Sequence, residues 1–104
     1  MVRYNVRYAK SARRDLYDIS HYIAIELNEP VTALRITETI EKAVESLDTV
    51  PHRCVLVDDE RLAAMGYRIL PVKNYIAFFT VDEEARIVRV ERILYNKRDW
   101  QRIL

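Results

Sequence analysis

The fold is decided by residues 66–104, GYRILPVKNYIAFFTVDEEARIVRVERILYNKRDWQRIL, which contain three extended runs and a short basic tail. In chain order the runs and turns are residues 67–72, the turn Lys73-Asn74, residues 75–81, the turn 82–85, and residues 86–95. Short polar segments between apolar runs supply the chemistry of tight turns. Two successive hairpins of this kind predict an antiparallel meander of three strands.

Several residues in this stretch carry more specific predictions. The middle run, residues 75–81, is apolar on both faces, which is typical of a central strand covered on both sides. Gly66 is the only glycine and predicts an unusual φ or a close approach. Pro71 predicts that its strand ends early or bulges. Residues 96–104 predict a short terminal helix with Asn96 as its cap.

In the last run, strict alternation predicts two different faces. One face carries Val88, Val90, Arg92 and Leu94, and the other carries Ile87, Arg89, Glu91, Ile93 and Tyr95. Arg92 and Tyr95 are therefore expected on opposite faces. They share a site only at the end of the sheet, or where the strand twists or bulges.

The first half of the chain predicts one strand followed by two helices. Residues 2–9 alternate between apolar and polar side chains, which is the period of a half-buried strand. Ser11 precedes an amphipathic helix with the apolar stripe Ala12, Leu16, Ile19, Tyr22, Ile23 and Leu27. Pro30 opens a second helix, whose stripe is Ala33, Ile36, Ile40, Ala43, Val44 and Leu47. Residues 51–65 are the least regular, with a short strand expected near 55–57 and a polar turn after it.

These elements predict an α+β fold in a single domain, residues 1–104. A helical hairpin needs a sheet to cover its apolar stripes. We therefore expect an N-terminal strand, a two-helix hairpin, an antiparallel three-strand meander and a short C-terminal helix. The sheet is expected to be curved and mainly antiparallel with about four strands, the first of them at one edge, and both helices on one face.

Composition limits the class of protein. Half of the 104 residues are apolar and about a third are charged, as in ordinary globular domains. No apolar run reaches the length of a membrane span, and the N-terminus lacks the apolar core of a signal peptide. One cysteine, Cys54, cannot form an internal disulfide, so we expect a reducing cytoplasm. No cluster of metal-ligating residues occurs, so no metal or organic cofactor is expected.

Charge is unevenly distributed although the net charge is only +1. Residues 86–104 hold six Lys and Arg against two acids, whereas residues 15–48 hold eight acids against Arg35 and Lys42. A basic surface of this kind attracts phosphates. The structural alternative is that two solvated faces of opposite charge balance each other.

The order and spacing of short motifs resemble those of the RelE/ParE superfamily of bacterial toxins from type II toxin–antitoxin pairs. The resemblance covers nearly the whole chain, and it is carried by Tyr4-Asn5-Val6-Arg7-Tyr8, Asp15-Leu16, Ile19 to Ile23, Pro30 with Ala33, Leu47 with Pro51, Gly66 to Val72, Asn74 to Phe79, Arg92 to Tyr95, Arg98-Asp99-Trp100 and Leu104. Each motif is weak alone, and together they are specific for the superfamily rather than for a branch within it.

The resemblance implies a toxin held inactive by a cognate antitoxin, with a role in plasmid stabilization and with a homodimer or a heterotetramer as candidate assemblies. In the RelE branch the toxin enters the ribosome and cleaves mRNA, and in the ParE branch it poisons DNA gyrase. The basic tail and Tyr95 favour translation inhibition by a metal-independent endoribonuclease. The central strand carries no basic residue, unlike the denser Lys and Arg clusters of RelE-type nucleases, which keeps gyrase inhibition open. An inactive relic or binding module is the third alternative.

The candidate residues follow from what metal-free RNA cleavage needs, namely a proton acceptor, a proton donor and cations for the phosphorane. We expect catalytic roles for Arg68, Arg92, Tyr95 and Arg98, and RNA binding by Lys73, Arg89 and Lys97. Neither histidine, His21 or His52, lies on the sheet, which disfavours a histidine-based nuclease.

Structural roles compete with each of these assignments. A half-buried arginine is more often paired with an acid, so the alternative for Arg92 is an ion pair, and for Arg68 a surface pair. The alternative for Tyr95, one of seven tyrosines, is a packing role. Trp100 is expected to pin the tail to the core, and Glu91 to pair with Arg68 or Arg89.

Overall fold

The computed structural model describes residues 2–104. Its elements, in chain order, are β1 (Asn5–Tyr8), α1 (Lys10–His21), a π-helical turn η1 (Tyr22–Glu26), α2 (Pro30–Glu45), the 3-10 turns η2 (Ser46–Asp48) and η3 (Pro51–Arg53), α3 (Glu60–Ala64), β2 (Arg68–Val72), β3 (Tyr75–Asp82), β4 (Ile87–Tyr95) and α4 (Trp100–Ile103). This order confirms the predicted α+β fold, including Pro30 in the first turn of the second helix.

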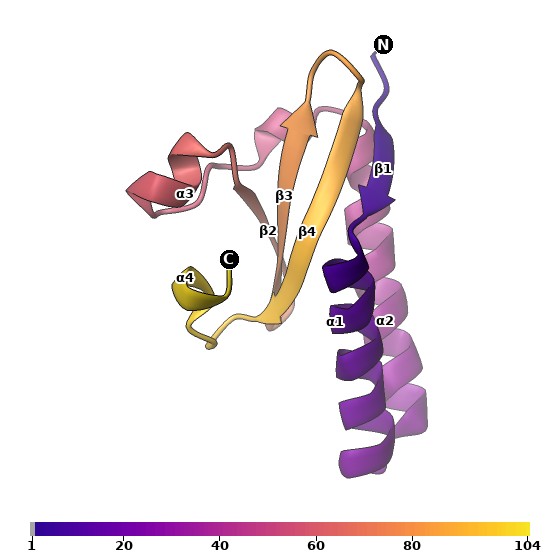
Figure 1. Ribbon diagram of the computed structural model, residues 1–104. Helices are drawn as coiled ribbons and strands as arrows, with labels where there is room; N and C mark the ends of the chain where they lie inside the picture. Colours follow the sequence, from indigo (N-terminus) through magenta and orange to yellow (C-terminus); the bar gives the residue numbers. More distant parts are fainter. Residues whose placement is uncertain (1) are drawn as a thin grey trace.

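The four strands form one sheet in the order β1-β4-β3-β2. The N-terminal strand β1 pairs with β4 in parallel, while β2, β3 and β4 form the antiparallel meander. The predicted edge position of the first strand is thus confirmed. The parallel pairing is possible because α1 and α2 carry the chain back across the sheet before β2 begins (Figure 1).

The sheet is covered on both faces, but unequally. The long helices α1 and α2 lie on one face, and the short α3 and α4 lie on the other (Figure 1). The larger core joins the helix stripe to Phe79, Val88 and Val90, and the smaller one joins Phe78 and Leu94 to α3 and to Trp100. The prediction of a doubly covered central strand, β3, is confirmed. Trp100 lies 5.5 Å from the Phe78 ring, which confirms its role in holding the tail on the core.

The prediction that side chains alternate strictly between the two faces along β4 is wrong. Phe78 pairs with Arg92 and Phe79 pairs with Val90, so Glu91 is an extra residue in a β-bulge. A bulge reverses the alternation of the side chains. Val90 and Ile93 therefore both belong to the larger core, whereas Leu94 belongs to the smaller one.

Local start and stop signals were only partly predictive. Helix α1 begins at Lys10 with no side-chain cap, so Ser11 does not precede it, and α4 begins at Trp100, so Asn96 does not cap it. Pro71 neither ends nor distorts its strand, because β2 is an edge strand and Pro71 is exposed there.

The segment before the meander also differs from its prediction. The polar turn expected after residues 55–57 is the helix α3, capped by the Asp59 carboxylate, which accepts a hydrogen bond from the Leu62 amide at 3.0 Å. The short strand is only an isolated bridge between Leu56 and Arg68. Gly66 has the predicted positive φ, 86°, and no atom crowds the space where a Cβ would stand. Its role is therefore conformational.

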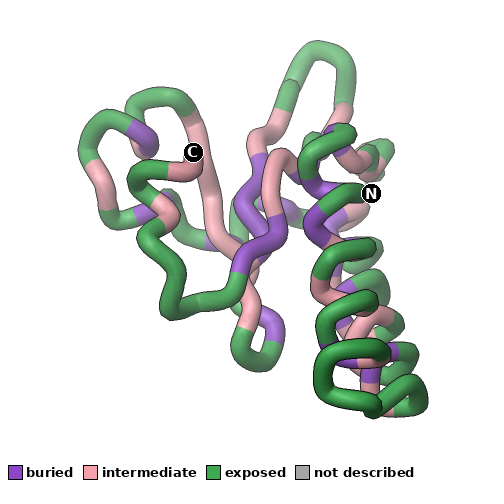
Figure 2. Tube along the Cα trace, turned by 60° about the horizontal axis from the view of Figure 1, so that its bottom comes forward, coloured by how far each residue is buried: buried purple, intermediate pink, exposed green. Residues whose placement is uncertain are grey.

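The helical hairpin extends past the sheet. Ile23 and Ala33 are buried between the helices, but Tyr22 and Leu27 are 55% and 52% exposed, although both were expected in the buried stripe. Figure 2 shows this end of the hairpin as mostly exposed. Among residues 2–104, none of the helices combines the length and the hydropathy that a membrane span requires.

Candidate functional site

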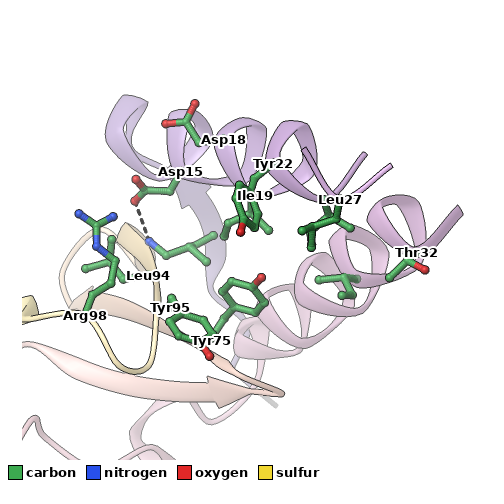
Figure 3. A pocket seen from close by; sticks show the side chains of 13 residues that line it. Asp15, Asp18, Ile19, Tyr22, Leu27, Thr32, Tyr75, Leu94, Tyr95 and Arg98 are labelled. Carbon is green, nitrogen blue, oxygen red and sulfur yellow. Dashed lines mark hydrogen bonds between the residues drawn. The ribbon is translucent and has the colours of Figure 1, made fainter. Parts of the chain in front are cut away.

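A groove of about 710 Å³ lies between the free end of the helical hairpin and the end of the sheet where β3 begins and β4 ends. It exists because the apolar stripe of α1 and η1 continues beyond the strands that cover it. Its walls, shown in Figure 3, are mainly apolar and aromatic, and they consist of Asp15, Asp18, Ile19, Tyr22, Ile23, Leu27, Thr32, Ile36, Tyr75, Ile93, Leu94, Tyr95 and Arg98. These residues are called the groove below.

The Asp15 carboxylate fixes one end of the groove. It accepts hydrogen bonds from Arg92 Nε at 2.8 Å, from the Arg92 terminal nitrogen at 2.9 Å and from the Ile93 amide at 2.9 Å. β1 ends opposite Val90, so the edge of β4 has no partner strand beyond that point. Asp15 binds the Ile93 amide that a longer β1 would have bound, and it thereby sets α1 against the sheet (Figure 3).

Arg92 is held by the same carboxylate. The hydrogen bonds to Asp15 raise the pKa of the Arg92 guanidinium above its ordinary value, while burial acts in the opposite direction. This bidentate pair uses Nε and one terminal nitrogen of Arg92, and it joins the guanidinium to a largely buried acid. Arg92 therefore lies in the structural arrangement that was the alternative to a catalytic role.

Tyrosines form the opposite wall of the groove. The rings of Tyr75 and Tyr95 meet edge to face, with centroids 5.8 Å apart. Burial raises the pKa of the Tyr75 hydroxyl, and the neighbouring Tyr95 and Tyr22 hydroxyls raise it further. Tyr75 is therefore a neutral phenol at neutral pH, able to donate or accept a hydrogen bond but unsuited to act as a phenolate base.

Arg98 is the free cation of the groove. It is exposed, and no carboxylate of residues 2–104 forms an ion pair with it. Asp18 pairs with Arg14 at 3.4 Å on the outside of α1. The groove thus offers aromatic surface, one unpaired guanidinium and a few hydrogen-bonding groups. This combination is typical of sites that bind an apolar side chain and orient it by a few polar contacts.

The structure brings together only some of the residues predicted from the sequence. Tyr95 and Arg98 line the groove. Lys73 and Lys97 lie at the same end of the sheet, because the Asn96 amide donates to the Asn74 carbonyl at 2.8 Å. Lys73 itself occupies the β2–β3 turn with a φ of 57°.

The other predicted residues lie elsewhere. Arg68, on the edge strand β2, donates to the Cys54 carbonyl at 2.7 Å and does not line the groove. Arg89 pairs with Glu91 at 3.3 Å, one of the two partners predicted for that glutamate. Neither histidine lines the groove: His21 stacks on Tyr17, and His52 lies against Glu83. Among residues 2–104, no group of side chains is arranged to hold a metal ion.

Sequence reasoning missed most of the groove. Ile19, Tyr22, Leu27 and Ile36 were recognised only as parts of the apolar stripes, and Tyr75 only as part of a buried strand. Their spacing is the same whether a stripe is covered by the sheet or left open. One available signal was Asp15, an acid within the apolar face of α1, because a buried acid requires a partner.

Comparison with known proteins identifies the family. The model of the ParE toxin of the type II toxin–antitoxin system parDE matches residues 6–100. The chain belongs to the ParE toxin family. This result confirms the RelE/ParE superfamily as predicted. No curated protein matches the chain.

Solved structures show the same fold. The chromosomal ParDE system of P. aeruginosa has a TM-score of 0.71 and 22% identity, covering 91% of this chain and 98% of that one. The RelBE2 toxin–antitoxin complex of Mycobacterium tuberculosis has a TM-score of 0.63 and 24% identity, covering 91% of this chain and 93% of that one. The RelE–RelB complex of Pyrococcus horikoshii OT3 has a TM-score of 0.58 and 11% identity, covering 94% of this chain and 99% of that one. At these identities the similarity shows a shared fold.

Proposed function

We propose that this ParE-family chain is a toxin that arrests growth by inhibiting DNA gyrase, and that a cognate antitoxin neutralises it by binding in the groove. The observation that supports the gyrase target is the dispersal of the four residues predicted to be catalytic. Arg68 donates a hydrogen bond to the Cys54 carbonyl, and Arg92 forms an ion pair with Asp15. Of the four residues, only Tyr95 and Arg98 line the groove.

The chemistry of metal-free RNA cleavage supports the same choice. That reaction needs a proton acceptor for the 2′-hydroxyl, a proton donor for the leaving oxygen and cations at the phosphorane, all within hydrogen-bonding reach of one phosphate. In the groove Asp15 already accepts three hydrogen bonds, and Tyr75 is a neutral phenol. A surface that binds a protein needs no such constellation.

Ribosome-dependent mRNA cleavage is the second candidate. Tyr95 and Arg98 line the same groove, so a phenol and an unpaired guanidinium are available together. In this alternative Arg98 offsets the charge of the phosphorane and Tyr95 orients or protonates the substrate. Loss of one such contact costs about 3 kcal/mol of transition-state stabilisation, or roughly a hundredfold in rate.

Two assays run side by side distinguish these targets. Purified toxin is added to a gyrase supercoiling reaction and to an in vitro translation reaction in which mRNA cleavage is followed by toe-printing. Gyrase inhibition is expected to rise with toxin dose while the mRNA stays intact. Cleavage of ribosome-bound mRNA with unimpaired supercoiling would overturn the gyrase assignment.

The antitoxin is proposed to insert a segment that is disordered alone and folds on binding. The groove is open on one side, apolar on its walls and marked by one free cation, Arg98, so it suits an amphipathic segment that carries an acidic residue. Because the aromatic anchors of such interfaces carry much of the affinity, Tyr22 is expected to contribute strongly.

A matched pair of variants tests the binding site. Tyr22 and Tyr17 are both exposed tyrosines near the same end of the helical hairpin, but only Tyr22 lines the groove. Tyr22→Glu is expected to weaken antitoxin binding at least thirtyfold, about 2 kcal/mol, and Tyr17→Glu to leave it near wild type. Calorimetry with the small protein encoded beside the toxin measures both. Equal affinities for the two variants would place the antitoxin elsewhere.

A further inference from the structure

The N-terminal strand and the start of the first helix are unusually cationic. Residues 2–14 contain five Lys and Arg, namely Arg3, Arg7, Lys10, Arg13 and Arg14, and no acid. All five are exposed. β1 is an edge strand, and α1 follows it after one residue, so this cationic segment begins at one edge of the sheet (Figure 1).

Strand register places one further cation, Arg89, beside this segment. Arg7 of β1 is the direct partner of Arg89 in β4, so the two side chains share the face of the sheet that α1 and α2 do not cover. Like charges directly opposite each other destabilise a sheet. Glu91 forms an ion pair with Arg89 at 3.3 Å, which offsets the charge of Arg89, but no ion pair within residues 2–104 includes Arg7.

The first turns of α1 add to these cations. α1 runs beside β4, because the Ala9 amide donates to the Val90 carbonyl at 2.9 Å and Asp15 accepts from the Ile93 amide. Lys10 and Arg14 are one helical turn apart and exposed. The first turn of α1 contains no acid, although the helix dipole disfavours cations there. The arrangement is thus unfavourable for folding on two independent grounds.

We propose that a basic edge, consisting of Arg7, Lys10, Arg14 and Arg89, binds the phosphate backbone of nucleic acid. Arg7 and Lys10 have no carboxylate partner within residues 2–104, and Arg14 and Arg89 have one each, Asp18 at 3.4 Å and Glu91 at 3.3 Å. A cluster of four exposed cations matches the repeated charge of a polyphosphate. Three of the four are arginines, whose planar guanidinium binds phosphate through two hydrogen bonds.

The surroundings of the basic edge favour nucleic acid over an acidic protein segment. Protein partners are held mainly by apolar and aromatic anchors. The large apolar residues that are exposed in residues 2–104 occur neither between residues 3 and 14 nor between 86 and 92. The inference goes beyond the proposed function, since a gyrase holding DNA and a ribosome holding mRNA both present phosphates to a bound toxin.

The test measures salt-dependent binding by fluorescence anisotropy. The full-length toxin is titrated into a labelled 20-base-pair DNA duplex and into a labelled single-stranded RNA at several salt concentrations. The variant is Arg7→Gln/Lys10→Gln. The control is Arg35→Gln/Lys42→Gln, which removes the same charge from exposed positions of α2. Neither pair belongs to the groove.

The expected result is a loss of about two units in the slope of log K against log salt for the Arg7/Lys10 variant, one for each phosphate contact. The control keeps the wild-type slope. Tighter binding of the duplex or of the RNA then identifies which nucleic acid is the ligand. Equal slopes for the two variants would overturn the proposal, as would polyglutamate displacing the toxin as effectively as unlabelled nucleic acid.

Discussion

Replacing Asp15 by alanine is expected to destabilise the protein more than any other change to a surface or half-buried charge. The Asp15 side chain is 9% exposed, and it accepts three hydrogen bonds, two from Arg92 and one from the Ile93 amide. The variant leaves a half-buried guanidinium and a buried amide without partners. Breaking one side of a buried ion pair costs about 3–5 kcal/mol, and we place this case near 3 kcal/mol because a quarter of the Arg92 side chain, 26%, reaches solvent.

The measurement is thermal unfolding followed by circular dichroism. For a domain of this size, 3 kcal/mol corresponds to a decrease in Tm of roughly 15 °C. Asp18→Ala is the matched control, since Asp18 lies one turn along the same helix, is 61% exposed and forms only a 3.4 Å pair with Arg14. Exposed pairs of this kind contribute well under 1 kcal/mol. If the Asp15 and Asp18 variants melt within a few degrees of each other, the structural role assigned to Asp15 is refuted.

Three further substitutions test other parts of the fold by the same method. Burial, helped by Glu41 and Glu45, raises the pKa of the Tyr8 hydroxyl from 10.0 to about 12, and this buried hydroxyl has no hydrogen-bond partner within residues 2–104. Since folding favours the neutral phenol, the stability that this pKa shift contributes is complete below about pH 10 and is lost as pH rises towards about 12. Tyr8→Phe is expected to match the stability of the wild type at pH 7 and to lose less stability between about pH 10 and 12. Identical pH profiles of stability for the two proteins would contradict this role of the Tyr8 hydroxyl. Gly66→Ala is expected to cost about 1 kcal/mol, because alanine is strained at a φ of 86°; an unchanged Tm would be inconsistent with that strain. Trp100→Ala is expected to cost about 2–3 kcal/mol through lost packing on Phe78, less than for a fully buried tryptophan; an unchanged Tm with lost toxicity would instead assign Trp100 to target binding.

The sequence was sufficient for the architecture because its signals there are local and periodic. Alternation, the helical stripes, Pro30 and the two turns set the order of the elements, and the edge position of the first strand followed from them. The bulge at Glu91 could not be predicted, since nothing within β4 marks the extra residue. It arises from how β3 and β4 pair across the sheet, and it changed the face assigned to Ile93.

The candidate site was harder to predict, because the groove forms where the sheet stops covering the apolar stripes of the helices. Tyr22 and Leu27 continue the stripe of α1, and only the assembled sheet shows that no strand reaches them. Charge alone also does not show whether an arginine side chain is free to bind a ligand. Arg68 and Arg92 carry the type of side chain that a nuclease needs, but each is engaged with a group distant in sequence, the Cys54 carbonyl and the Asp15 carboxylate.

The gyrase target is tested most directly by following plasmid DNA in a reaction that contains purified gyrase, ATP and increasing amounts of toxin. Wild-type toxin is expected to prevent supercoiling in proportion to dose. Arg98→Gln removes the free cation of the groove without breaking an ion pair within residues 2–104. If gyrase binds the same groove as the antitoxin, this variant requires at least tenfold more toxin while keeping the wild-type Tm. Full supercoiling at a toxin concentration that still arrests growth would contradict the account.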